Sequence, residues 1–64
     1  MSAFLGKKVT IEDKYGEEHV GVIKGVDKDL NCVILDDGIE IVCIPLDNVK
    51  IIRLMAKVKV TAPR

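Results

Sequence analysis

The sequence predicts a small all-β protein, in which a strongly bent five-stranded antiparallel sheet curls into an open barrel. Seventeen of the 64 residues are Val or Ile and only five are Leu, and branching at Cβ favours strands. Short apolar stretches, some of them alternating with polar residues, are separated by turn residues, which is typical of strands. Gly21 and Gly25 lie inside one such stretch and provide places where a strand can bend sharply.

Five strands are expected in chain order. Val9 and Ile11 alternate with polar residues and predict the first strand, which a turn over 13–16 follows. An interruption at 45–48 separates the last two strands, and a helical turn at 2–5 is the only helix expected. The strands are expected over 8–12, 18–26, 30–35, 39–44 and 49–54.

The third and fourth strands form a predicted hairpin. Asp37 and Gly38 separate two apolar stretches, and an Asp-Gly pair in this position predicts a two-residue turn. In that register Cys32 lies directly opposite Cys43, and both faces of the hairpin are apolar. We therefore expect its own barrel to cover one face and a neighbouring subunit to cover the other. The two cysteines are interpreted as small buried hydrophobic residues rather than as a disulfide or a reactive thiol.

Length and composition exclude several classes of protein. A chain of 64 residues holds one domain, whose stability is marginal without a disulfide, a metal or a partner subunit. Its apolar stretches are shorter than the roughly 20 residues of a membrane span, and its first residues lack a signal-peptide pattern. We therefore expect a cytosolic or nuclear protein, with the cytoplasm as the predicted location, and no membrane partner.

Catalytic and metal-binding motifs are not evident. Two cysteines and the single His19 are too few for a four-ligand zinc site. The sequence shows no nucleophile–base set and no phosphate-binding glycine loop. The acidic residues are expected in turns without burial, and His19 and Tyr15 on the surface. We expect no catalytic residues, no metal, no cofactor and no small-molecule substrate, and hence no enzyme.

Charge is unevenly distributed along the chain. The net charge is zero, which excludes a strongly basic protein that coats nucleic acid by charge alone. Residues 1–52 hold all ten acidic and six of the basic side chains, a balance of −4, whereas residues 53–64 hold four basic side chains and no acidic one. Residues 55–64 are expected to form a solvated basic tail or a short extra strand.

Two segments carry a resemblance to a known family. Residues 21–31 have a glycine, a hydrophobic residue, Asp27, a further hydrophobic residue and Asn31 at the spacing of the first Sm motif. Residues 44–49, with Ile51 and Ile52 after them, resemble the second Sm motif. The chain thus resembles small, single-domain Sm-like (LSm) proteins of the archaeal type, with a domain over 1–54.

The resemblance implies an SH3-type open barrel that assembles head to tail into a homo-oligomeric ring, with a hexamer or a heptamer expected. In the family, the fourth strand pairs with the fifth strand of the next subunit. Single-stranded, uridine-rich RNA binds around the central pore, and the ring serves as a scaffold or chaperone in RNA processing. The subunit contacts that the resemblance implies fall at Ile39, Ile41, Cys43, Val49 and Ile51.

The implied RNA-binding residues are Asn31, Asp29, Asp27 and Pro45. Asn31 takes the place of the asparagine that hydrogen-bonds the base edge. Asp29 stands where the family has the side chain that stacks on the base, and Pro45-Leu46 replaces an Arg-Gly pair. Two further hypotheses follow: an Sm-like ring without the uridine pocket, acting as a structural or protein-interaction assembly, and an SH3-like barrel that stays monomeric.

Overall fold

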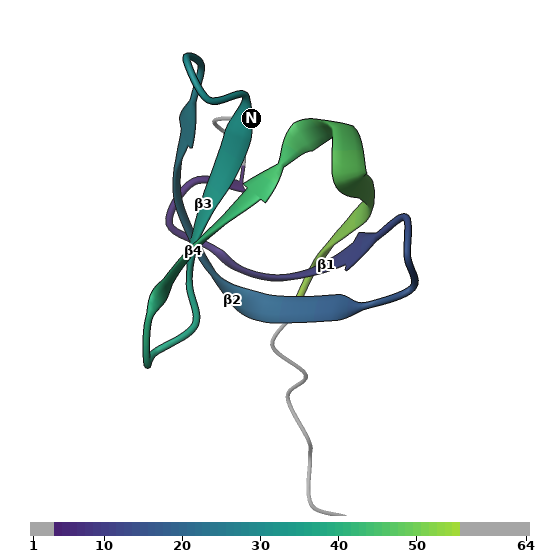
Figure 1. The fold of residues 1–64 in the computed structure, drawn as a ribbon. Helices are drawn as coiled ribbons and strands as arrows, with labels where there is room; N and C mark the ends of the chain where they lie inside the picture. The colour runs from purple at the N-terminus through teal and green to yellow at the C-terminus, as the bar shows by residue number, and fades with distance from the viewer. Residues whose placement is uncertain (1–3, 56–64) are drawn as a thin grey trace, which may run out of the picture.

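The fold is a single five-stranded antiparallel sheet, bent into an open barrel (Figure 1). The computed structural model of the protein describes residues 4–55. The strand order is β4-β3-β2-β1-β5, so β4 and β5 are the two edges of the sheet. The predicted all-β fold class is confirmed. The elements are β1 (Lys8–Asp13), β2 (Glu18–Asp27), β3 (Cys32–Asp36), β4 (Ile41–Pro45), the short 3-10 helix η2 (Leu46–Asn48) and β5 (Val49–Leu54).

The observed bounds of the first, second and fifth strands agree with the predicted bounds to within one residue. The predicted fifth strand coincides with β5, and the predicted first and second strands each end one residue short of β1 and β2. The helical turn expected at 2–5 begins outside the described residues, as does most of the tail expected over 55–64. Within residues 4–55, no helix has the length and apolar character that a membrane span requires.

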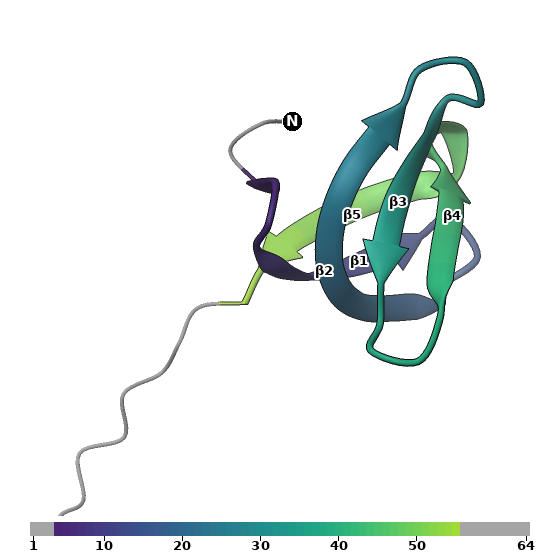
Figure 2. The same cartoon turned by 90° about the vertical axis from the view of Figure 1, so that its left-hand side faces the viewer.

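The strand β2 bends so strongly that it belongs to both halves of the barrel (Figure 2). Its first half pairs with β1 and its second half with β3. The pairing with β3 shifts register between Ile23 and Gly25, and such a bulge increases the local bend of a strand. Gly21 lies before the bulge, where a Cβ atom would come within 2.5 Å of the Asp36 carbonyl oxygen. Only glycine permits this close approach of the two strands.

The core fills the inside of the bent sheet. On β1, Val9 and Ile11 are completely buried and alternate with more accessible residues, as the period of a half-buried strand requires. Aliphatic side chains of the other strands meet them, and β-branched residues dominate. The remaining buried members of this cluster are Ile23, Val33, Leu35 and Ile44, against which Phe4, Val42, Leu46, Val49 and Ile52 pack.

The predicted register of the β3–β4 hairpin is wrong by two residues. Cys32 pairs with Pro45, and Cys43 pairs with Ile34. Four residues, 37–40, make the connection, because the Asp37 carboxylate accepts hydrogen bonds from the backbone N–H groups of Ile39 and Glu40, both at 2.8 Å. These bonds also lower the pKa of the Asp37 carboxyl, and the hydrogen bond from the Glu40 N–H has the largest effect.

This connection lengthens the loop at the expense of the strand, since β4 begins only at Ile41. Ile39, predicted in the strand, is instead a loop residue that is 93% exposed. The Asp36 carboxylate accepts a third hydrogen bond in the same loop, from the Gly38 N–H at 2.9 Å, and Gly38 adopts a positive φ of 96°. Side-chain acceptors next to the glycine thus favour a wider loop over the two-residue turn.

The two faces of the hairpin differ in burial. Val33, Leu35 and Ile44 face the core. On the opposite, outer face Cys32 is buried, whereas Ile41 and Cys43 are exposed. The interpretation of Cys32 as a small buried hydrophobic residue is therefore confirmed. Cys43 is exposed within the described subunit, because its strand lies at the edge of the sheet and nothing in that subunit covers its outer side. Its burial was expected from a neighbouring subunit as well, and stays a prediction.

Candidate functional site

The loop between β2 and β3 is held by one carboxylate. Oδ1 of Asp27 accepts hydrogen bonds from the backbone N–H groups of Asp29 and Leu30, at 2.9 and 3.1 Å. An aspartate that binds the backbone two and three residues further on closes a tight turn. Asp27 therefore shapes this loop, which makes its Oδ1 unavailable to a ligand.

Asn31 ends the same loop in a left-handed conformation. Its φ is 54°, a value that asparagine tolerates better than most residues with a side chain. Its carbonyl oxygen accepts a hydrogen bond of 2.8 Å from the Leu46 N–H. The loop before β3 is thereby tied to η2, and Asn31 is exposed at this junction.

The four residues predicted to contact RNA lie together at one end of the hairpin. Cys32 pairs with Asp27 on one side and with Pro45 on the other, and Asn31 precedes it. Asp29 is the middle one of the three residues, 28–30, that separate Asp27 from Asn31. The fold therefore gathers both sequence segments in one place, at the upper end of the sheet in Figure 1.

This place combines an amide, an exposed carboxylate and apolar surface. The Asn31 amide provides one hydrogen-bond donor group and one acceptor. Asp29 and Pro45 are exposed, and Leu30 is 68% exposed. No aromatic side chain belongs to this loop or to η2. A single-stranded nucleic acid would find an amide and apolar surface here, but no ring on which a base could stack.

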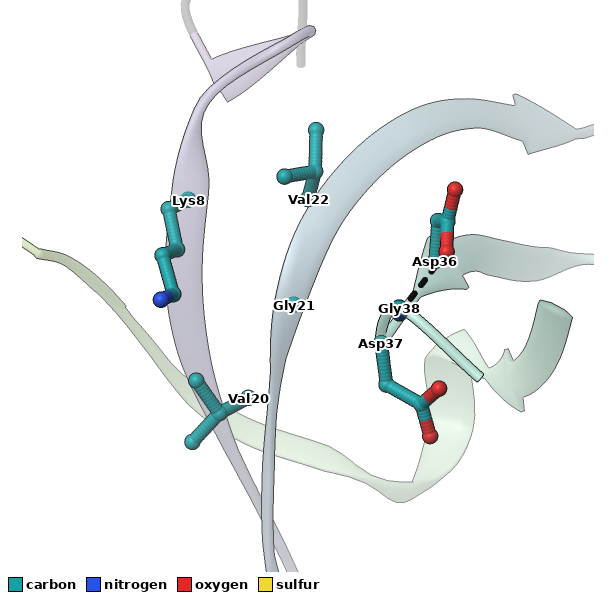
Figure 3. A pocket seen from close by; sticks show the side chains of 7 residues that line it. All are labelled: Lys8, Val20, Gly21, Val22, Asp36, Asp37 and Gly38. Carbon is teal, nitrogen blue, oxygen red and sulfur yellow. Dashed lines mark hydrogen bonds between the residues drawn. The ribbon is translucent and has the colours of Figure 1, made fainter. Parts of the chain in front are cut away.

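A second concave surface, which was not predicted, lies at the opposite end of the β3–β4 hairpin, beside the loop that joins the two strands. Its volume is about 420 Å³, and Figure 3 shows the side chains around it. The close approach of Gly21 to Asp36 forms its floor, and Lys8 lies on β1 at one side. A glycine within a strand was the only sequence signal for it. The lining residues are Lys8, Val20, Gly21, Val22, Asp36, Asp37 and Gly38.

A third group of polar side chains surrounds Asp13 at the end of β1. Contrary to the expectation for acidic residues, Asp13 is buried, with 6% of its surface exposed. Its Oδ1 accepts hydrogen bonds from the Tyr15 and Glu17 N–H groups, both at 2.9 Å, and its Oδ2 lies 3.0 Å from Nε2 of His19. His19 is consequently half-buried, and its predicted surface position is wrong; Tyr15 is 74% exposed, as expected.

Hydrogen bonding accounts for this group. The His19 side chain is the main reason that the pKa of Asp13 is lowered; burial raises it, and the backbone bonds from Glu17 and Tyr15 lower it further. Carboxylate and imidazole atoms of Asp13, Glu17 and His19 lie within 4.8 Å of one another, so these three are the described residues that could approach one metal ion. Both oxygens of Asp13 already have partners, which leaves a turn-stabilising role as the sufficient explanation.

Four of the five residues predicted at subunit contacts lie on the two edge strands of the sheet, and Ile39 lies in the loop before β4. Ile41 and Cys43 belong to β4, and Val49 and Ile51 to β5. Ile41 is 59% exposed and Ile51 37% exposed. Within residues 4–55, backbone groups without a strand partner and apolar side chains thus coincide at both edges, which is a combination that favours pairing with another chain.

Comparison with protein families decides what this architecture is. The model of the LSM domain matches residues 1–54. The chain belongs to the LSM family. No curated protein and no solved structure matches it. The archaeal type and the cytoplasmic location stay predictions.

Membership of the LSM family gives the described features a common context. LSM proteins are generally associated with RNA, form oligomeric rings and are not enzymes. In this LSM chain the two segments that resemble the Sm motifs meet at the contact between Asn31 and Leu46. The departures from the family pattern, at Asp29 and at Pro45-Leu46, fall on the same junction.

Proposed function

We propose that the protein forms a homo-oligomeric ring that binds single-stranded, uridine-rich RNA and acts as a scaffold or chaperone in RNA processing. The observation that carries this proposal is the junction of the two motif segments. A backbone hydrogen bond of 2.8 Å joins Leu46 to Asn31, and the Asn31 side chain is exposed beside it. Its amide can donate to a uracil carbonyl and accept from the uracil N3–H.

Ring formation is supported by the two free edges of the sheet. One subunit presents β4 at one edge and β5 at the other, so head-to-tail pairing of identical subunits uses both edges and closes when the rotation permits. The apolar contacts proposed there are those of Ile41, Cys43, Val49 and Ile51, together with Ile39 in the loop before β4. A neighbouring subunit would also cover the outer side of β4, and extra burial is what so small a chain requires.

The test of RNA binding must respect the backbone at Asn31. Because φ is 54° there, an alanine would strain the loop and confuse misfolding with loss of contact. Asn31→Gly retains the conformation and removes the amide, whereas Asn31→Asp keeps the size, removes the donor and adds a negative charge that repels phosphate. We expect Asn31→Gly to weaken binding of oligo-U about two- to tenfold, the value of one net hydrogen bond, and Asn31→Asp to weaken it further. Fluorescence anisotropy at fixed salt measures this, with oligo-A as the control for backbone binding.

Asp29 and Pro45-Leu46 favour a second candidate function, an Sm-like ring that acts as a structural or protein-interaction assembly. Among residues 4–55, neither an aromatic nor a guanidinium side chain belongs to the junction of the 28–31 loop and η2, and the exposed Asp29 carboxylate would repel phosphate. Native mass spectrometry with and without oligo-U separates the two candidates. An intact ring that binds neither oligo-U nor oligo-A supports the structural assembly, and a single subunit at all concentrations contradicts both.

A further inference from the structure

Two thiols lie on the same face of the β3–β4 hairpin. Cys43 is paired with Ile34, two residues after Cys32, so the two cysteines occupy diagonal positions on adjacent strands. Because side chains alternate along a strand, both project from the outer face. Val33 and Ile44, their neighbours in sequence, face the core instead. The observed register therefore brings the thiols together diagonally on the surface of the sheet.

The surroundings of the two thiols differ. Cys43 is exposed, whereas 3% of Cys32 is exposed, and both are free. Burial raises the pKa of the Cys32 thiol, and the neighbouring Cys43 thiol and the Asp27 charge raise it further. Cys32 is thus kept protonated and shielded, whereas Cys43 meets solvent. This difference assigns separate chemical roles to the two residues, because a small oxidant reaches Cys43 first.

Closure of a disulfide requires a small movement of one strand. Diagonal neighbours on antiparallel strands have Cα atoms about 7–8 Å apart, whereas a disulfide joins Cα atoms at up to about 6.8 Å. The strand β4 can supply this movement, because it is an edge strand and pairs with β3 alone within the described subunit. A bond closed in this way retains strain, and strained disulfides are reduced easily.

We propose that Cys43 is a modification site for peroxides and that Cys32 is its resolving residue. The Cys43 thiolate attacks hydrogen peroxide, the O–O bond breaks, and hydroxide leaves as a sulfenic acid forms on Cys43. The Cys32 thiol then attacks the sulfenic sulfur, its proton and the sulfenic hydroxyl leave as water, and the S–S bond forms. The peroxide gains the two electrons that the two thiols lose, and an external dithiol returns them.

This inference is independent of RNA binding, but it has a consequence for the proposed ring. Cys43 lies on the strand that is proposed to pair with the next subunit, and the disulfide fixes that strand to β3 in a shifted position. Oxidation is therefore expected to be fastest in the unassembled subunit, and the oxidised chain is expected to assemble less well. The mass of the denatured chain reports the disulfide, and native mass spectrometry of the assembly reports the ring. Failure of the thiol proposal is therefore distinguishable from failure of the proposed ring.

The experiment treats the folded 64-residue chain with hydrogen peroxide, at protein concentrations from nanomolar to micromolar. Wild-type chain is expected to lose about two mass units, the two hydrogens of a disulfide, and to regain them with dithiothreitol. Cys32→Ala is expected to accumulate a dimedone-reactive sulfenic acid on Cys43, because no resolving thiol is present. In Cys43→Ser, Cys32 is expected to stay reduced, and an alkylating reagent is expected to reach it only after the chain is unfolded. Circular dichroism verifies that each variant is folded.

Three results would overturn the proposal. The first is wild-type chain that keeps both thiols after peroxide treatment at every concentration. The second is oxidation of Cys32 in Cys43→Ser at the rate seen in wild type, since that would show that Cys43 is not the point of attack. The third is a disulfide found only between two chains.

Discussion

Nε2 of His19 lies 3.0 Å from Oδ2 of Asp13, and the carboxylate that it contacts is buried at the end of β1. The carboxylate can only accept, so the imidazole donates its Nε2–H. The opposite oxygen of Asp13 holds the 13–17 turn through two backbone N–H groups. One buried charge therefore joins the first hairpin to its own turn.

The first prediction concerns acid stability. Because the folded-state pKa of Asp13 is lowered from 3.8, the stabilisation that it provides is complete above the pKa of the unfolded chain. It is lost as the pH falls through the folded pKa. Asp13→Asn keeps an acceptor for the turn and removes the titration, so we expect lower stability than wild type at neutral pH and a flatter dependence on pH. Urea unfolding between about pH 2 and pH 6 measures both.

His19→Gln is the matched control for this pair. It retains a side-chain N–H that can reach Asp13 but carries no charge at any pH. If Asp13→Asn loses stability in acid as steeply as the wild type does, another carboxylate dominates the acid transition, and the assignment to Asp13 is wrong.

The second prediction concerns the two glycines of β2. A Cβ at Gly21 would lie 2.5 Å from the Asp36 carbonyl oxygen and 3.0 Å from Cγ of Leu35. Backbone and buried side chain cannot both yield, so Gly21→Ala is expected to destabilise the fold by about 1–3 kcal/mol, the usual cost of overpacking. Gly25→Ala is the control, because no atom lies within 4 Å of the added carbon there. Its free energy of unfolding is expected to stay within about 0.5 kcal/mol of wild type.

Thermal or urea unfolding of the two variants gives the answer. Equal destabilisation by both substitutions would mean that the bend of β2, rather than the contact with β3, requires glycine.

The sequence predicts the strands well because their burial follows a local pattern. Val9 and Ile11 alternate with polar residues and are completely buried, and β-branched residues mark the other strands in the same way. Such a pattern can be recognised from residues that are close together in the sequence. It therefore also supports the resemblance to the Sm motifs, whose spacing follows the same strands and turns.

The hairpin register and the environment of Asp13 could not be obtained in this way. An Asp-Gly pair favours a two-residue turn, but here the carboxylates of Asp36 and Asp37 bind backbone N–H groups of the loop and widen it. The burial of Asp13 depends on His19, which lies on the next strand and faces it only after the hairpin has formed. Side-chain partners selected by tertiary structure decide both features, and hydrophobic periodicity carries no information about them.

The third prediction concerns assembly. Ile41 lies on the edge strand β4 and is 59% exposed, whereas Val20 lies on the inner strand β2 and is 43% exposed. A lysine at an exposed edge opposes pairing with another strand. We therefore expect Ile41→Lys to lower the ring to single subunits, and Val20→Lys, a matched change away from both edges, to leave the ring intact. Light scattering and native mass spectrometry measure the mass.

Loss of the ring in Val20→Lys alone would contradict assembly through the edges and would place the contact on the outer face of β2. Unfolding midpoints of both variants separate loss of assembly from loss of fold.

The fourth prediction concerns the position at which the chain departs most from the uridine site implied by its family resemblance. Asp29 is exposed, and only its backbone N–H takes part in the turn, through the bond of 2.9 Å to Asp27. Asp29→Phe preserves that bond, removes a charge that repels phosphate and adds a ring on which a base can stack. Stacking contributes about 1–3 kcal/mol per base, so we expect affinity for oligo-U to rise about five- to 150-fold.

Asp29→Ala separates the two effects, because it removes the charge without adding a ring. Fluorescence anisotropy at two salt concentrations then distinguishes them, since a gain from charge weakens with salt and a gain from stacking is largely retained. Equal affinities of Asp29→Phe and Asp29→Ala would show that no base reaches this loop, and would favour the ring as a structural assembly.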